Sequence, residues 1–263
     1  MNLFFFDVDG TLLEFSKGIR DISPELKEAL KTIHANGDQY FICTGRSHGA
    51  LPSAIRTMDA DGYSLCAGAF VTMGGEEIRN VHFSQDTLDF ILKRLNQFET
   101  IQYLECGLEL YTNQYDSAVS GGSNEQFGID PGYLKPLGET KGLKVNKLSV
   151  TFLHREDIEA MEDFCDHGIT VLSHPSPDSF DITLAHSTKR DGIKAVRQHL
   201  DLGRDVRIIA FGDNYNDIEM IDYADIGVAM GNGPDDLKRI ADLVTRSVEE
   251  NGVYYGLREL GVV

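Results

Sequence analysis

Residues 3–13 read LFFFDVDGTLL, in which four large apolar residues run directly into two aspartates and then a Gly-Thr turn. An apolar run of this length that stops at a turn signal is typical of a strand buried on both faces of a parallel sheet. We therefore predict a buried strand over residues 3–6. Asp7 and Asp9 would then lie at its carboxyl end.

The segment that follows predicts one helix and a second strand. Residues 23–37 (SPELKEALKTIHANG) form the helix, because Ser23 can cap its start and Gly37 can end it. Residues 39–46 (QYFICTGR) form the next apolar strand, which ends near Thr44. The order strand, helix, strand indicates an open parallel α/β sheet, whose ligands bind beyond the carboxyl ends of the strands.

The C-terminal part of the chain returns to the same alternation. Residues 187–202 predict a helix, residues 205–217 a strand and loop, residues 226–230 a strand, and residues 234–244 a helix. These strand and helix units belong with the N-terminal ones in a single α/β core.

The stretch between the two parts has a different pattern. Helices are predicted over 85–98 and 156–168, and strands near 101–105, 108–112, 147–152, 169–173 and 180–185. We interpret residues 83–184 as an inserted α+β domain, and residues 1–82 and 185–263 as the core. Residues 113–132 are rich in Gly, Ser and Asn, which predicts a mobile loop within the insert.

The net charge of −18 excludes some partners. A field of this sign repels nucleic acid and anionic membrane surfaces, so neither is an expected partner. The N-terminus has no basic region and no stretch approaches the roughly 18 continuous apolar residues of a membrane span, which favours the cytoplasm. We expect a monomer or a weak homo-oligomer.

The cysteines do not indicate a structural framework. Cys43, Cys66, Cys106 and Cys165 include no C-x-x-C pair, so neither a zinc ribbon nor a small disulfide scaffold is predicted. No two histidines have a spacing suited to a shared metal. Free thiols are the expected state.

Carboxylates gather where the predicted strands end. Asp7, Asp9, Asp213 and Asp217 should converge in one crevice. Two carboxylates about 4 Å apart repel by roughly 4 kcal/mol at an effective dielectric constant near 20, so either some are protonated or a cation lies among them, and a cation explains the cluster better. Hard oxygen ligands of this kind favour Mg²⁺. A calcium-binding loop is excluded, because its twelfth position would be Gly18 where a glutamate is required.

Groups suited to a phosphoryl ligand accompany the carboxylates. Lys189, the hydroxyl of Thr44 and backbone N–H groups near Gly10 and Gly45 would supply positive charge and hydrogen-bond donors. One aspartate can attack phosphorus, while a second protonates the leaving oxygen and later activates water. The residues therefore predict phosphoryl-transfer chemistry.

The motifs also resemble those of a known family. DVDGTL (7–12), TGR (44–46), the lysine of KRDGI (189–193), and GDNYNDIEM (212–220) followed by GVAMGNGPDDLK (227–238) resemble the four motifs of the haloacid dehalogenase-like phosphatases, specifically the Cof-type sugar phosphatase subfamily. They span the whole chain in family order. The resemblance implies a Rossmann-like parallel-sheet core with an inserted α+β cap domain of type IIB.

The resemblance also implies roles for individual residues. Asp7 would be the nucleophile and Asp9 the general acid and base. The implied phosphate-binding residues are Val8, Asp9, Thr44, Gly45, Lys189 and Asn216. The implied ligands of Mg²⁺ are Asp7, Asp9 through its backbone carbonyl, Asp213 and Asn214, with Asp217 supporting Lys189 and a metal-bound water.

Some positions depart from the family or allow a second interpretation. The family often has Asn-Gly before the cap, whereas this chain has Ala67-Gly68-Ala69. Lys194 is the weaker alternative to Lys189 for the phosphate-binding lysine. Arg46 could contact substrate or serve a structural role, and Gly231-Asn232-Gly233 is interpreted as a loop beside the crevice.

Together these observations predict a Mg²⁺-dependent phosphatase that acts on a small phosphorylated metabolite, with hexose phosphates favoured, through an aspartyl-phosphate. One alternative is a phosphotransferase like phosphomannomutase, which would return the phosphoryl group to a sugar. The other is a non-catalytic regulator that binds Mg²⁺ or a phosphosugar. The cap is expected to select the substrate, and no motif in it names that substrate.

Overall fold

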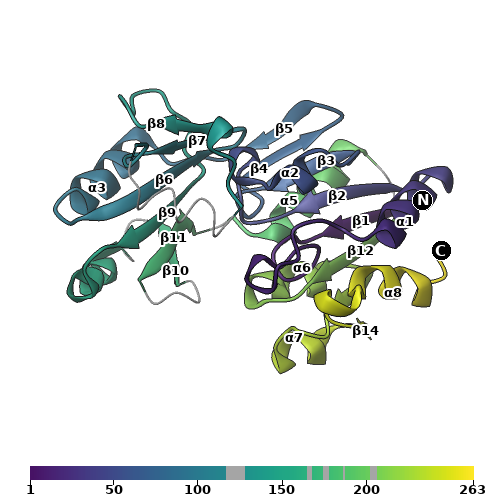
Figure 1. The fold of residues 1–263 in the computed structure, drawn as a ribbon. Helices are drawn as coiled ribbons and strands as arrows, with labels where there is room; N and C mark the ends of the chain where they lie inside the picture. Colours follow the sequence, from purple (N-terminus) through teal and green to yellow (C-terminus); the bar gives the residue numbers. More distant parts are fainter. Residues whose placement is uncertain (117–127, 165–167, 174–177, 186, 202–205) are drawn as a thin grey trace. The chain divides into compact units, whose positions relative to one another are not determined.

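The computed structural model describes residues 1–263 except 117–127, 165–167, 174–177, 186 and 202–205 (Figure 1). The chain forms two compact units. The core unit comprises Met1–Gly45, Pro52–Arg79 and Thr188–Val263, and the insert unit comprises Arg46–Leu51 and Asn80–Ser187. The sequence does not indicate that Arg46–Leu51 belongs with the insert. The domain limits drawn from the sequence, with the insert at 83–184, stay a prediction.

The core unit is built on a mainly parallel sheet, which has eight strands among the described residues. Their order across the sheet is β14-β13-β12-β1-β2-β3-β4-β5, with neighbouring pairs parallel from β14 to β3 and β4 antiparallel to β3. The strands are β1 (Asn2–Phe6), β2 (Gln39–Cys43), β3 (Gly62–Leu65), β4 (Phe70–Met73), β5 (Glu76–Asn80), β12 (Arg207–Gly212), β13 (Ile226–Ala229) and β14 (Leu243–Val244).

The predicted buried strand is β1, which the structure places between β12 and β2 (Figure 1). Its residues Leu3–Phe6 are fully buried, as expected for a strand covered on both faces. Phe6 is in register with Phe211 of β12 and Ile42 of β2. The chain therefore leaves the sheet at Asp7, beside the ends of both neighbouring strands.

The predicted helix after β1 is α1 (Pro24–Ala35). The Ser23 hydroxyl accepts a hydrogen bond from the Leu26 N–H at 3.0 Å, which satisfies one of the free donors at the helix start. Gly37 has a φ of +77°, a left-handed conformation that glycine adopts readily after a helix. Local sequence thus sets both ends of α1.

The other helices of the core unit are short apart from α5. They are α2 (Ser53–Arg56), α5 (Lys189–His199), α6 (Ile218–Tyr223), α7 (Asp235–Ile240) and α8 (Gly252–Glu259), with 3₁₀ helices η1 (Phe15–Lys17), η5 (Tyr215–Asp217) and η6 (Val248–Glu250). In α5 the Thr188 side chain and that of Asp191 form a capping box, so the helix begins at Lys189. None of the helices in the described part of the chain is long and apolar enough to cross a membrane.

The insert unit contains a mixed sheet whose described strands have the order β10-β11-β9-β6-β7-β8. Neighbours are antiparallel except β7 and β8, which are parallel. The strands are β6 (Thr100–Cys106), β7 (Glu109–Thr112), β8 (Leu134–Pro136), β9 (Lys147–Phe152), β10 (Ile169–Ser173) and β11 (Ser179–Leu184). The helices are α3 (Gln85–Leu95) and the 3₁₀ helices η2 (His48–Ala50), η3 (Pro131–Tyr133) and η4 (Arg155–Phe164).

The insert unit has its own apolar core, formed by α3, η4 and strands of the sheet. Leu88, Ile91 and Leu95 of α3 pack with Phe164 of η4 and with Leu148 of β9. The predicted fold class, a mainly parallel core sheet with an inserted α+β unit, is confirmed. The helix predicted over 156–168 is described as the 3₁₀ helix Arg155–Phe164, and residues 165–167 lie outside the described residues.

Several sequence predictions fall partly or wholly outside the described residues. The loop expected over 113–132 includes residues 117–127, the helix over 187–202 includes residue 202, the strand and loop over 205–217 include residue 205, and Cys165 lies wholly outside. Among the described residues, Cys43, Cys66 and Cys106 form no disulfide bond with one another, and Cys43 and Cys66 are buried.

Candidate active site

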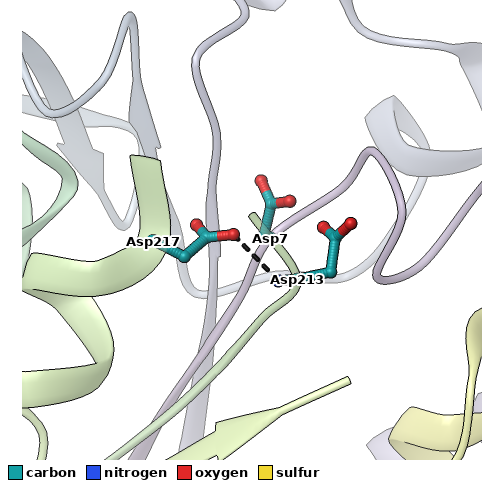
Figure 2. A group of neighbouring side chains, drawn as sticks. All are labelled: Asp7, Asp213 and Asp217. Carbon is teal, nitrogen blue, oxygen red and sulfur yellow. Dashed lines mark hydrogen bonds between the residues drawn. The ribbon is translucent and has the colours of Figure 1, made fainter. Parts of the chain in front are cut away.

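The ends of three adjacent parallel strands bring the predicted acidic and hydroxyl residues to one edge of the core sheet. Asp7 follows β1, Thr44 follows β2 and Asp213 follows β12. The Asp7 N–H donates to the carbonyl oxygen of Phe211 at 3.0 Å, which extends the ladder by one residue. Figure 2 shows Asp7, Asp213 and Asp217 gathered there. Strand topology therefore assembles the cluster that the sequence places at separate strand ends.

Lys189 connects two of these carboxylates. Its ammonium Nζ lies 2.6 Å from Asp7 Oδ1 and 2.5 Å from Asp217 Oδ1. The side chains of Lys189 and Asp217 are 1% and 0% exposed. Hydrogen bonds of this kind, between charged groups away from water, are stronger than those between neutral groups. Lys189 is thus held rigidly against Asp7.

The second oxygen of Asp217 has a different function. Asp217 Oδ2 accepts the backbone N–H groups of Asp213 at 2.9 Å and Asn214 at 3.0 Å. The first of these bonds is drawn in Figure 2. A carboxylate that accepts such N–H groups fixes the local backbone. Asp217 therefore positions both Lys189 and the loop that carries Asp213.

Burial and negatively charged neighbours raise the pKa values of Asp7 and Asp213. The pKa of Asp7 is raised well above its ordinary value, chiefly by burial, with Lys189 opposing the rise and Asp217 and Asp213 adding to it. Burial also raises the pKa of Asp213 to about 7, with Asp217 as the next cause. For Lys189, burial lowers the pKa, but Asp217 and Asp7 reverse this and leave the pKa raised. The ammonium group alone does not neutralise the cluster.

The carboxylates present a candidate metal site. Oxygen atoms of Asp7, Asp213 and Asp217 lie within 4.8 Å of one another. Asp217 is 0% exposed, and its oxygens accept the Lys189 ammonium at 2.5 Å and two backbone N–H groups, whereas Asp213 is only half-buried and accepts longer bonds from side chains, so Asp7 and Asp213 are the better ligands. A donor set made only of carboxylate oxygen suits a hard divalent cation, and it offers nothing to one that prefers sulfur or nitrogen. The residues therefore fit the predicted Mg²⁺.

The turn after β1 closely surrounds Asp213. Gly10 has a φ of +84°, and a Cβ at this position would lie 2.0 Å from Asp213 Oδ2, so only glycine fits. The Thr11 hydroxyl donates to Asp213 Oδ1 at 3.2 Å. Asn232 Nδ2 donates to Asp213 Oδ2 at 3.2 Å and to the Gly10 carbonyl at 2.9 Å. Asp213 is thus oriented from two other segments.

A turn with left-handed backbone conformation, which follows β3, is hydrogen-bonded to the backbone of Thr44. Cys66 and Ala67, after β3, have φ values of +50° and +53°, which is unusual for residues other than glycine. The Ala67 N–H donates to the Thr44 carbonyl at 3.0 Å. A Cβ at Gly68 would lie 2.2 Å from the Thr188 carbonyl oxygen. The same turn therefore contacts both the Thr44 backbone and the start of α5.

The remaining predicted site residues lie at other positions. Val8 is fully buried, and its carbonyl accepts backbone N–H groups of the following turn. Asp9, Asn214 and Asn216 are exposed, and the Asn214 side chain accepts the N–H of the next residue at 2.8 Å. Gly45 is half-buried. None of these four polar or small side chains belongs to the buried cluster around Lys189.

The sequence left two questions open: whether Lys189 or Lys194 is the phosphate-binding lysine, and whether Arg46 contacts substrate or has a structural role. Lys194 pairs with Asp191 at 3.6 Å and is 41% exposed, so Lys189 is the lysine that reaches Asp7. Arg46 Nη1 donates to the carbonyl oxygen of Ala50 at 2.9 Å, a contact within its own segment.

Sequence reasoning did not identify Thr11 and Asn232 as contacts of Asp213. Thr11 lies inside the first motif, so its hydroxyl could have been predicted as a hydrogen-bond donor to one of the carboxylates of the site. Asn232 stands between two glycines, a pattern that indicates only a loop. Its place beside Asp213 depends on the pairing of distant strands.

Comparisons with known proteins agree with this geometry. Residues 4–257 match the family model described as haloacid dehalogenase-like hydrolase. The protein YkrA of Bacillus subtilis (strain 168) is 28% identical over 270 residues, which cover 99% of this chain and 98% of YkrA. The 5-amino-6-(5-phospho-D-ribitylamino)uracil phosphatase YitU of the same organism is 27% identical, over 98% of this chain and 96% of YitU. The solved structure of the subclass IIB sugar phosphatase BT4131 is 25% identical with a TM-score of 0.82, and the match covers 100% of both chains.

Proposed function

We propose a mechanism and a substrate class for this chain, which belongs to the haloacid dehalogenase-like hydrolases and is a phosphoric monoester hydrolase. In this proposal, Asp7 is the nucleophile, Mg²⁺ is the cofactor and sugar phosphates are the substrates. The family and the relatives support a phosphatase that acts on small phosphorylated substrates. The sugar class, the metal and the residue roles are the proposal.

The observation that carries the proposal is the buried contact between Asp7 and Lys189. Their side chains are 6% and 1% exposed, and the ammonium lies 2.6 Å from one oxygen of Asp7. This leaves the second oxygen of Asp7 for attack on phosphorus. Lys189 would also offer charge to the phosphoryl oxygens as the negative charge there develops.

The chemistry uses two aspartates for different steps. The Asp7 carboxylate forms a bond to phosphorus while the bond from phosphorus to the leaving oxygen breaks, which gives an acyl phosphate. Asp9, which is exposed two residues further on, donates a proton to the leaving oxygen. Asp9 then takes a proton from the water that hydrolyses the acyl phosphate and regenerates Asp7.

The raised pKa of Asp7 explains the need for a cation. A nucleophile must be ionised, yet burial and the Asp213 and Asp217 carboxylates disfavour its charge. Mg²⁺, when bound by Asp7 and Asp213, supplies positive charge that favours the ionised carboxylates and offsets the charge of the phosphoryl group.

The sugar-phosphate proposal rests on likeness. BT4131 is described as a sugar phosphatase, and YitU acts on a phosphorylated ribityl compound, so both substrates carry phosphate on a polyhydroxylated carbon chain. A panel of hexose, pentose and polyol phosphates, together with the YitU substrate, is therefore the appropriate test.

The experiment compares Asp7→Asn and Asp9→Asn by release of inorganic phosphate. Asp7→Asn should abolish turnover on every substrate. Asp9→Asn should lose far less on p-nitrophenyl phosphate, whose leaving group needs little protonation, than on a sugar phosphate. Asp21→Asn, an exposed position of the same unit, is the control and should retain full activity.

Two results would overturn parts of the proposal. Equal losses for both variants on both substrates would contradict the division of roles. Transfer of phosphate to a sugar acceptor without release of inorganic phosphate would favour the phosphotransferase alternative.

A further inference from the structure

The segment Arg46–Leu51 begins one residue after Gly45, which adjoins Thr44, and it packs within the insert unit. The His48 N–H donates to the Gly107 carbonyl at 2.8 Å. A Cβ at Gly49 would lie 2.9 Å from Leu110 Cβ, so the backbone of Gly49 lies close against β7. The segment that leaves the second motif is therefore seated on the insert sheet.

Ala50 completes this packing. It belongs to a buried apolar cluster with Ile101 and Tyr103 of β6, Leu110 of β7 and Leu134 of β8. The cluster is separate from the larger apolar core of the insert unit. Burial of apolar surface thus adds to the backbone contacts that seat the segment.

Glu105 provides the polar anchor of the segment. This residue of β6 is 3% exposed, and its Oε2 accepts the Ser47 N–H at 2.5 Å. Its Oε1 lies 2.8 Å from Lys147 Nζ and accepts the Ser149 hydroxyl at 3.0 Å. Lys147 Nζ also lies 3.1 Å from Asp181 Oδ2. Two side chains of β9, which Asp181 of β11 supports in turn, therefore fix the Glu105 carboxylate.

These contacts argue against direct substrate recognition by Glu105. The Glu105 and Lys147 side chains are 4% and 6% exposed, and each is committed to charged or hydrogen-bonding partners inside the unit. A substrate hydroxyl would have to displace one of them, which leaves a buried charge with fewer partners. The geometry suits holding Ser47 in place.

We propose that Glu105 is a positioning residue that restrains the phosphate-binding turn at Thr44-Gly45 through the backbone of Ser47, an inference that rests on the proposed function. Ser47 is three residues from Thr44, so their Cα atoms are at most about 11 Å apart. A fixed Ser47 N–H thus limits where Gly45 can lie. Apart from its two chain neighbours, no described residue would have an atom within 4 Å of a Cβ at Gly45, so packing at that Cβ position does not restrain it.

The consequence is that the insert unit acts on phosphate binding in general and does more than select the substrate. Ser47 belongs to the insert unit and Gly45 to the core unit, so the chain passes from one unit to the other between these residues. Loss of the anchor should weaken binding of the phosphoryl group common to all substrates. The ranking among substrates should not change.

Ser47→Pro is the direct test, because it removes the N–H and leaves Glu105 and Lys147 unaltered. Ser47 has a φ of −76°, within the range that proline fixes. Ser47→Ala is the matched control: the buried hydroxyl has no hydrogen-bond partner among the described residues, so its removal should leave activity within about twofold. Glu105→Gln is a second variant, which weakens the same hydrogen bond by replacing the carboxylate acceptor with a neutral amide.

Three measurements decide the outcome. Ser47→Pro and Glu105→Gln should each lower kcat/KM on the order of tenfold, equally for p-nitrophenyl phosphate and sugar phosphates, because a hydrogen bond to a charged group is lost. Binding of inorganic phosphate, followed by calorimetry, should weaken to a similar extent. Amide hydrogen exchange of residues 46–51 should be faster in Glu105→Gln than in the parent protein.

A changed substrate ranking would overturn the proposal and make Glu105 a specificity residue. Parent-like phosphate affinity in both folded variants would also overturn it, as would unchanged amide exchange. A parent protein without phosphatase activity would refute the proposed function alone, because phosphate binding and amide exchange still test the anchor.

Discussion

Replacing Lys189 with methionine removes the ammonium group that lies between Asp7 and Asp217. Methionine is flexible and apolar, so it can occupy the space of the lysine stem. The site is 1% exposed, and water therefore has little access to replace the lost charge. Two buried carboxylates would remain, with Asp213 nearby.

The distances set the size of the effect. At 2.6 and 2.5 Å, and an effective dielectric constant near 20, each attraction to Lys189 is roughly 6 to 7 kcal/mol before the penalty of desolvation. That penalty offsets much of it, and removal of one partner from a buried ion pair typically lowers stability by about 3–5 kcal/mol. We expect this loss in unfolding free energy for Lys189→Met near pH 7.5 without metal.

The loss should depend on pH. Burial already raises the pKa of Asp7 and Lys189 opposes that rise, so without the ammonium group the Asp7 carboxyl binds a proton more readily in the folded protein than in the unfolded chain. A folded pKa above the unfolded value gives stability that is full at low pH and is lost as pH rises through the folded pKa. Lys189→Met should therefore recover stability as the pH falls toward about 5.

Urea unfolding followed by circular dichroism, in chelator at about pH 5.5 and 7.5, measures the effect. Lys194→Met is the control, because this exposed lysine has a single 3.6 Å ion pair within the same helix and should lose less than about 0.5 kcal/mol. The double variant Lys189→Met with Asp217→Asn should be more stable than Lys189→Met alone. A loss below about 1 kcal/mol, or one that is equal at both pH values, would refute the reasoning.

Two further predictions concern the turn after β3 and the metal. Ala67→Gly should raise the unfolding free energy by up to about 1 kcal/mol, because the left-handed conformation penalises alanine by roughly 1–2 kcal/mol and the entropy of glycine returns part of that gain. Ala69→Gly is the control: it removes a buried methyl group at a residue without positive φ and should lower the unfolding free energy by about 1 kcal/mol. If urea unfolding shows that Ala67→Gly also lowers the unfolding free energy, the Ala67 backbone is not strained. Burial raises the pKa of Asp213 from an ordinary 3.8 to about 7, so the stability of the metal-free protein should decline as the pH rises between these two values. Below about pH 7, Mg²⁺ must displace a proton from Asp213 in order to bind. Calorimetric affinity for Mg²⁺ should fall by up to about tenfold per pH unit below that point, whereas equal affinity at about pH 5.5 and 7.5 would argue against the Asp213 ligand.

The sequence by itself determined the elements whose signals are local. The apolar residues 3–6 predicted β1, because a strand buried on both faces needs apolar side chains at every position. Ser23 and Gly37 predicted the ends of α1, because caps act within one helical turn. Since parallel strands share a carboxyl edge, the order of the elements also predicted that Asp7 and Asp213 would meet.

Only the tertiary structure decided how the residues of the site support one another. Asp217 divides its two oxygens between Lys189 and the backbone of its own loop, and Asn232 reaches Asp213 from another loop. Ala67 adopts a left-handed conformation where the local sequence indicates no strain. Glu105 accepts the N–H of Ser47, 58 residues away in the chain. Such contacts depend on strand register and on the packing of distant segments, and neither hydrophobic period nor capping residues encode them.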